Sequence, residues 1–382
     1  MMSLKSKCEL LEVVRPRYLK ASKAEKQKIL DEFTWATQYH RKHAIRVLKN
    51  QVQVQNHFKR KTKTYKTIYC GEVVQALEQI WEIYGRICSK RLQPYLPEAI
   101  KVLERCQEIE LSRKIKALLL RISSASIDRC LRPVRLKSPH GLSITKPGSL
   151  LKNLISVQTF TAWDEERPGF MEVDLVAHCG NTTEGQYLNT LTCTDLCTGW
   201  TDVTALLHRS QEAVSKAIQL MRQRLPFPLL GIDSDNDSEF INDLLYRYCQ
   251  HEKITFTRSR PYKKNDQAHV EQKNWSVVRH TVGYDRWETA QELALLESIY
   301  DDLRLYINFF QPSFKLIAKE RIGNQTIKRY DTAKTPYQRV LERKDISLEA
   351  KARLMNVYVQ LNPAELRRCI DQKTARLWKI SR

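Results

Sequence analysis

The chain has 382 residues, two to three times the length of a typical domain, which favours two or more folding units. It carries 64 Lys or Arg against 43 Asp or Glu, and a net charge of +21 on an apolar fraction of 42% indicates a polyanionic partner, nucleic acid first. The sequence shows neither a long apolar run nor a secretory leader, which excludes a membrane transporter and predicts a soluble, intracellular protein without a membrane partner.

Ten cysteines are scattered along the chain without a CxxC pair. This pattern argues against a disulfide framework and a zinc ribbon. We expect reduced thiols that are mostly buried, with Cys193 and Cys197 in the core, and we expect no structural zinc.

Residues 1–70 hold 17 Lys or Arg and only 5 Asp or Glu, so the charge excess is concentrated at the N-terminus. Ser22 and Glu25 have capping-box spacing, and an apolar helical repeat follows up to Gln38. A second helix over 39–49 has an apolar face and a basic face, the latter with Arg41, Lys42, Arg46 and Lys49. The pair resembles a helix-turn-helix whose basic second helix enters the major groove of DNA. The alternative is a helical hairpin with a solvated basic face.

Residues 71–132 are helical by pattern and are interpreted as a second DNA-binding unit. Ser124 is the expected cap of a short helix that turns Ile127 and Leu131 inward and presents Arg129 to DNA. Residues 133–167 begin with a stretch rich in Pro, Gly, Ser and Lys, and they are predicted to be a linker.

Near residue 168 the residue pattern changes from helical to strand-like. Short runs rich in β-formers predict strands over 171–178, 187–196 and 199–206, followed by a helix over 210–225. Beyond it we expect strands over 228–235 and 254–259 and helices over 238–251 and 267–282. Residues 168–316 are therefore predicted to form an α/β core, a mixed five-stranded sheet flanked by helices.

Three carboxylates fall where such a sheet presents them at one edge. Asp174 lies on the first strand, Asp235 ends the central strand, and Glu271 lies in the first turns of the long helix. Sixty residues separate the first two and 35 separate the last two. Oxygen ligands from separate elements are what Mg²⁺ requires, and two such ions can promote an in-line displacement at phosphorus.

The segments EVDLV (172–176), SDNDSEF (234–240) and KKNDQAHVEQKN (263–274) resemble the signature blocks of the DDE integrase and transposase superfamily. PGFMEVDLVAHCG (168–180), TGWTD (198–202), FTRSRPYKKNDQAHVEQKNWSVVR (256–279) and YINFFQPSFKL (306–316) resemble bacterial insertion-sequence transposases with an integrase catalytic core. The resemblance covers roughly residues 140–340.

The resemblance implies an RNase H-like core and metal-dependent strand transfer of a mobile element. Asp174, Asp235 and Glu271 would be the catalytic residues and the ligands of two Mg²⁺ or Mn²⁺ ions. The contacts to DNA phosphates or ends would come from Lys263, Lys264, Asn274 and Arg279. The implied partners are double-stranded DNA, as element ends and target, and further copies of the chain. In a bacterial host, the compartment would be the cytoplasm, at the nucleoid.

The sequence departs from the superfamily at Asp237, where Gly usually follows the Asp-Asn pair. A fourth acid there raises the alternative of a catalytically impaired relic that binds element ends or represses transposition. Another alternative is a nuclease that cuts without joining. Asp233 is the rival of Asp235 for the middle ligand, because residues i and i+2 of a strand face the same way.

Outside the acidic residues, apolar and aromatic side chains favour packing roles. Trp275, one turn after Glu271, is more often a core aromatic than a DNA contact, and His269 is expected to face away from the metals. Tyr306, Phe309 and Phe310 have helical spacing and predict packing. Residues 317–382 are predicted to be a small, basic, mostly helical extension.

Overall fold

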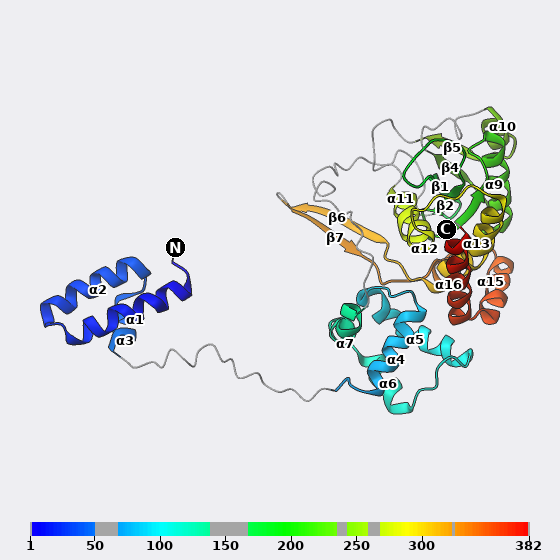
Figure 1. The fold of residues 1–382 in the computed structure, drawn as a ribbon. Helices are drawn as coiled ribbons and strands as arrows, with labels where there is room; N and C mark the ends of the chain where they lie inside the picture. Colours follow the sequence, from blue (N-terminus) through cyan, green and yellow to red (C-terminus); the bar gives the residue numbers. More distant parts are fainter. Residues whose placement is uncertain are drawn as a thin grey trace. The chain divides into compact units, whose positions relative to one another are not determined.

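We describe a computed structural model of the chain, which covers residues 2–49, 68–137, 167–234, 243–258, 268–322 and 325–380 (Figure 1). The chain divides into two compact units, Met1–Ile68 and Tyr69–Arg382. Each unit is described by itself.

The N-terminal unit consists of three helices, α1 (Leu4–Lys20), α2 (Lys23–Thr37) and α3 (Arg41–Lys49). The predicted capping box is confirmed, since Ser22 Oγ accepts the Glu25 N–H and Glu25 Oε2 accepts the Ser22 N–H. Helix α1, which precedes Ser22, was not predicted. All three helices contribute to one small core, formed by Leu11, Tyr18, Ile29, Leu30, Phe33, Ala44 and Leu48.

The second unit begins with four helices, α4 (Glu72–Ile83), α5 (Ser89–Arg105), α6 (Arg113–Arg121) and α7 (Ser124–Lys137). The helical prediction for this region is confirmed, and Ile127 and Leu131 are fully buried as expected. Two details of the prediction for α7 were wrong, its N-terminal cap and its C-terminal end. Ser123, and not Ser124, caps α7, because its Oγ accepts the Ser126 N–H at 3.2 Å. Pro133 lies inside α7, so the helix runs beyond the predicted start of the linker.

A mixed five-stranded sheet follows, with strands β1 (Phe170–Ala177), β2 (Asn189–Asp195), β3 (Thr201–Leu206), β4 (Gly231–Ser234) and β5 (Thr255–Arg258). The order is β3-β2-β1-β4-β5, in which β1, β2 and β3 are antiparallel neighbours, whereas β4 is parallel to both β1 and β5. The predicted five-stranded mixed sheet is thus confirmed.

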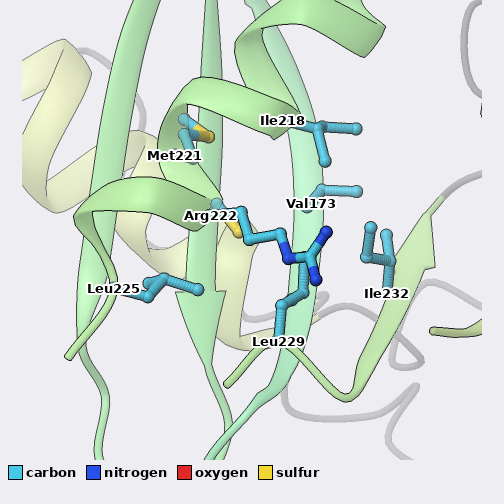
Figure 2. A pocket seen from close by; sticks show the side chains of 8 residues that line it. Val173, Ile218, Met221, Arg222, Leu225, Leu229 and Ile232 are labelled. Atoms are coloured by element: carbon cyan, nitrogen blue, oxygen red, sulfur yellow. The ribbon is translucent and has the colours of Figure 1, made fainter. Parts of the chain in front are cut away.

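Helices cover both faces of this sheet. On one face, α9 (Gln211–Arg224) packs over β1 and β4, where Ile218 and Met221 lie above Val173 and Ile232 and line a small, mostly apolar cavity (Figure 2). On the other face, α13 (Ala290–Phe310) packs with Tyr300 hydrogen-bonded to Thr190 of β2. A further helix, α10 (Asp243–His251), joins β4 to β5 in sequence.

The helix predicted over 267–282 is present but is not uniformly α-helical. It consists of α11 (Ala268–Lys273), a π-helical segment η2 (Asn274–Arg279) and α12 (His280–Val282). The His280 N–H donates to Trp275 O, five residues back. Such π segments often occur at functional sites, because they widen the helix and change the direction of the side chains that follow.

The C-terminal region is only partly as predicted. Its basic stretch forms an antiparallel hairpin of β6 (Leu316–Ile322) and β7 (Gln325–Tyr330), to which the sequence had assigned no element. Three helices follow, α14 (Pro336–Glu342), α15 (Leu348–Gln360) and α16 (Pro363–Ile380), which confirms the helical prediction for this part.

Helices α4–α7 and the C-terminal helices share one hydrophobic core with the sheet. Tyr306 Oη donates to Ile83 O at 2.7 Å, and Arg105 donates to the carbonyls of Tyr358 and Leu361. Phe309 and Phe310 are buried beside Tyr358, so the packing role predicted for the aromatic run is confirmed. Residues 71–132 and 317–380 therefore belong to the same compact unit as the sheet.

All ten cysteines are free thiols, as expected. Cys193, Cys197 and Cys249 are buried, whereas Cys70 and Cys88 are exposed, so the expectation of mostly buried cysteines holds for a minority. Among the described residues, no helix has the length and apolar character needed to cross a membrane.

Candidate active site

Strand β1 presents two carboxylates on the face of the sheet opposite α9. Glu172 and Asp174 are two residues apart and so point the same way, whereas Val173 between them lines the cavity below α9. Glu172 is buried, with 1% of its surface exposed, and Asp174 is half-buried. The two acids of the EVD segment therefore have different surroundings, and only Asp174 is open to solvent.

Glu172 holds the start of the helix that carries Glu271. Its Oε2 accepts the Val270 N–H at 2.8 Å. The first N–H groups of a helix have no partner within the helix, and a carboxylate at this end also interacts favourably with the helix dipole. Glu172 thereby fixes α11 against β1 one residue before Glu271.

Asn274 makes the second link between this helix and β1. Its Nδ2 donates to Asp174 Oδ2 at 2.6 Å. Glu271 lies three residues before Asn274, a spacing that puts two side chains on the same side of a helix. The exposed Glu271 carboxylate therefore lies within one helical turn of a side chain bonded to Asp174.

Strand β4 leads towards the same edge of the sheet. Its last residue, Ser234, pairs with Val173, the residue before Asp174. Asp233, the rival middle ligand, pairs with Glu172 and accepts a 2.6 Å hydrogen bond from Thr257 Oγ1 of β5. Asp235, the preferred ligand, lies outside the described residues.

The same holds for Asp237, Lys263 and Lys264, which also lie outside the described residues. Within the described ranges, no group of three or more His, Cys, Asp or Glu side chains is arranged to hold a metal. Asp174 and Glu271 have the chemistry of hard-cation ligands, since both are solvent-accessible carboxylates.

Other residues of the long helix have clear places in the structure. Arg279, a predicted DNA contact, donates to Ala177 O of β1 at 2.8 Å, and its guanidinium lies 4.7 Å from the centroid of the Tyr284 ring. Burial lowers the pKa of Arg279. Trp275 is 54% exposed, so the expectation of a core aromatic was wrong and its indole is available to a ligand.

The predicted DNA-binding residues of the terminal regions are exposed. On α3, Arg41, Lys42, Arg46 and Lys49 are exposed, whereas Ala44 and Leu48 are buried, and Arg41 forms an ion pair with Asp31. Arg129 is exposed on α7, where it donates to Ser126 Oγ at 2.9 Å. Their contact with DNA stays a prediction.

Sequence reasoning missed Glu172. The signal for it was present, since Glu172 and Asp174 have the i, i+2 spacing that puts both on one face of a strand. Its role depends on a helix whose start lies almost 100 residues further along the chain, which the spacing on β1 does not reveal.

No protein-family model matches the chain. The chain is 42% identical over 339 residues to the uncharacterized protein y4rM of Sinorhizobium fredii, and the alignment covers 88% of this chain and 95% of that protein. It is also 20% identical over 230 residues to Polycomb protein Pcl of Drosophila melanogaster, covering 59% of this chain but 21% of that protein. Among solved structures, the catalytic core domain of BIV integrase covers 46% of this chain and 94% of its own length, with 18% identity and a TM-score of 0.29.

Proposed function

The chain belongs to the same family as the uncharacterized protein y4rM of Sinorhizobium fredii, and we propose that it is a DNA transposase of the DDE type. The proposal is supported by the sequence blocks around Asp174, Asp235 and Glu271 and by the mixed five-stranded sheet that carries the first of them. The net charge of +21 suits a DNA substrate.

One observation carries the proposal. The hydrogen bond from Asn274 to Asp174, together with that from Val270 N–H to Glu172, holds the helix of Glu271 against β1. Two carboxylates that are 97 positions apart in the sequence are thus presented from adjoining elements. This is the arrangement that a cation-dependent phosphoryl-transfer site needs from separate parts of a chain.

In this proposal, Asp174, Asp235 and Glu271 hold two Mg²⁺ or Mn²⁺ ions. When bound, the ions supply a more nucleophilic oxygen and charge stabilisation at the reacting phosphorus. Asn274 fixes the orientation of the Asp174 carboxylate, and Glu172 fixes the helix that carries Glu271. These two act through their neighbours and are positioning residues.

The reaction has two displacements at phosphorus. Water attacks a phosphodiester at the end of the element, and the 3′ hydroxyl of the element leaves. That hydroxyl then attacks a phosphodiester of the target DNA, and the 3′ oxygen of the target strand leaves. The second step joins element to target, and no covalent protein intermediate forms.

Strand transfer tests the proposal. The full-length protein is incubated with Mg²⁺ or Mn²⁺ and labelled duplexes from the flanks of its own gene. Asp174→Asn, Asp235→Asn and Glu271→Gln are expected to abolish cutting and joining, whereas the control Glu297→Gln, an exposed acid on α13, retains both. Joining by Asp235→Asn but not by Asp233→Asn would assign the middle ligand to Asp233.

A second function is favoured by one sequence feature, Asp237 in place of the usual Gly. In that case the chain binds element ends without joining them. An Asp237→Gly variant run beside the native protein separates the two functions. Joined products from the native protein support the transposase, products from the Gly variant alone support the binding protein, and cutting without joining identifies a nuclease.

A further inference from the structure

Helix α15 lies at the margin of the second unit (Figure 1), where one of its faces is held to the core. On that face Ala350 is buried, and Leu354 and Tyr358 pack against the hydrophobic core. The Tyr358 ring stacks on the Tyr337 ring with 4.6 Å between the centroids, and Tyr358 Oη donates to Glu98 at 2.6 Å. These contacts fix which face of α15 is turned outward.

The outward face of α15 is an apolar stripe. Its members follow one another at intervals of four, three and four residues, and they are Leu348, Ala352, Met355 and Val359. All four are exposed, Leu348 by 83%, Met355 by 47% and Val359 by 58%. At 100° per residue they share one side of the helix, away from Ala350 and Leu354. A helix that is apolar on opposite sides is normally covered on both, so the α15 stripe is a surface for a partner.

The spacing of the α15 stripe fits a second copy of the chain. Intervals of four, three and four read the same in both directions, so an antiparallel copy of α15 presents its own stripe in register, as a two-fold contact requires. In this register Leu348 lies opposite Val359 of the second copy, and Ala352 lies opposite Met355. Each layer pairs a longer side chain with a shorter one, which lets the two helices approach evenly. A parallel copy would set Ala352 against Ala352 and underfill that layer.

The charges of α15 are compatible with this pairing. The helix carries Lys351 and Arg353 against Glu349, a net charge of +1 in a chain of +21, so it is a face where two basic chains can approach. In the antiparallel register the two copies of Lys351 are about 7.5 Å apart along the axis, and the two copies of Glu349 about 13.5 Å. Arg353 lies on the side of the helix away from the stripe.

The size of the stripe sets the expected strength of the contact. From Leu348 to Val359 it is about 17 Å long. One helix pair of this length buries less surface than the roughly 1,200 Å² of a stable complex. Association through the α15 stripe should therefore be reversible and dependent on protein concentration.

We propose that the α15 stripe is a two-fold contact between two copies of this chain, with the two α15 helices antiparallel. The inference goes beyond the proposed function and does not depend on it, because α15 carries none of the candidate catalytic residues.

The test is sedimentation equilibrium of the full-length protein, freed of nucleic acid, at about 1 to 100 μM, where a contact of this size should associate. Salt of about 0.3 M screens the repulsion between the two basic chains. Leu348→Glu and Val359→Lys are made singly and together. Both positions are exposed, and each new charge has the sign that the dipole favours at its end of the helix, so the fold should be retained. Leu136→Glu, at a leucine of α7 that is 78% exposed, is the matched control.

We expect the native protein and Leu136→Glu to dimerise alike. Each single variant on α15 should raise the dissociation constant by about tenfold or more, because a charge then faces an apolar side chain in two layers. The double variant should regain much of this loss, because the antiparallel register sets each new carboxylate opposite a new ammonium group. An unchanged urea midpoint in every variant would show that only association was altered.

A native protein that stays monomeric over the whole range would overturn the proposal, and so would an equal loss in Leu136→Glu. A double variant that associates no better than the single variants would overturn the antiparallel pairing. The assay contains neither DNA nor divalent metal, so its result is separate from that of strand transfer.

Discussion

The acids of the candidate site, Asp174 on β1 and Glu271 on α11, differ in solvent access from two acids of the neighbouring strands, Asp195 on β2 and Asp202 on β3. Asp195 and Asp202 are each 1% exposed, whereas Asp174 is half-buried and Glu271 is exposed. Asp195 accepts hydrogen bonds from Gly169 N–H, Thr198 N–H and Thr198 Oγ1. The comparison shows that Asp195 serves the fold, whereas Asp174 and Glu271 are open to a cation.

The surroundings of Gly169 and Asp202 extend the point. A Cβ on Gly169, which has φ of +115°, would lie 2.3 Å from Pro228 O, so the PGF segment needs glycine to fit. Asp202, in the TGWTD segment, accepts two hydrogen bonds from Arg224 of α9. The PGF and TGWTD segments therefore stabilise the sheet. The solvent-accessible acids, Asp174 and Glu271, are the candidates for catalysis.

Replacing one accessible acid and one buried acid by the matching amide is the strongest test of the difference between the two groups. Asp174→Asn keeps an acceptor for Asn274 and should reduce strand transfer by about 10³-fold or more, with little change in the free energy of unfolding. Asp195→Asn should instead destabilise the fold by roughly 2 kcal/mol, because its amide group meets donors where the carboxylate accepted them. Joining assays and urea unfolding of both variants measure the contrast. Loss of stability in Asp174→Asn would remove the distinction.

Replacing Arg224 tests the buried acids alone, because Arg224 is paired with Asp202. Arg224→Met leaves the Asp202 carboxylate buried without its closest cation, since Arg304 is 3.9 Å away. Removing one partner of a buried ion pair typically costs about 3 to 5 kcal/mol. Arg222→Met, on the same helix but with its ion-pair partner Glu252 more exposed, is the matched control and should cost less. Equal losses in urea unfolding would contradict a special role for the Asp202 pair.

The pH dependence of stability offers a finer test of Asp202. Burial raises its pKa to about 6 from 3.8, although the Arg224 and Arg304 charges oppose the shift. Between these two values the folded chain binds more protons at Asp202 than the unfolded chain, so this residue makes the free energy of unfolding fall as pH rises through the window. Asp202→Asn should remove that fall, by up to about 1.4 kcal/mol per pH unit. Unfolding curves at pH 4.5, 5.5 and 6.5 for both proteins would show it, and parallel curves would contradict it.

The sequence predicts those features of the structure that are determined by residues close together in the chain. The capping box at Ser22 and the strands around Asp174 follow from spacing, and both are confirmed. The β6–β7 hairpin was not predicted, because its basic residues carry no clear period and exposed strands lack the alternation that burial imposes. Helix α1 was not predicted, because the capping box at Ser22 marks the start of α2 and not of the unit.

The candidate site shows the same limit. Spacing and motif placed Asp174 and Glu271 on a strand and a helix, and the structure has them there. The Asn274–Asp174 bond, the anchoring of α11 by Glu172 and the exposure of Trp275 depend on how the helix docks and on its π-helical segment, which no local pattern encodes.

Asn274 tests whether docking of the helix matters to chemistry. Asn274→Ala removes the donor to Asp174 and should lower joining by about 10- to 100-fold, as is typical when the support of a metal ligand is lost. The Mg²⁺ concentration for half-maximal joining should rise while duplex affinity without metal stays unchanged. Ser276→Ala, an exposed change on the same π segment, is the control. A loss of activity with an unchanged Mg²⁺ requirement would show that Asn274 supports the fold and not the site.

The smallest effect is expected in the N-terminal unit, where charge is exposed and no buried pair is involved. Replacing Arg41, Lys42 and Arg46 by Gln should weaken duplex binding and reduce its salt slope by about 2 to 3, whereas the same change at Lys20, Lys23 and Lys28 should leave the slope nearly unchanged. Lys42 should contribute more than Arg41, because Asp31 already offsets the Arg41 charge. Anisotropy titrations of the single and triple variants measure both claims. Equal slopes for the two triple variants would mean that α3 is not a recognition helix, and its basic face would then be only the solvated side of a three-helix unit.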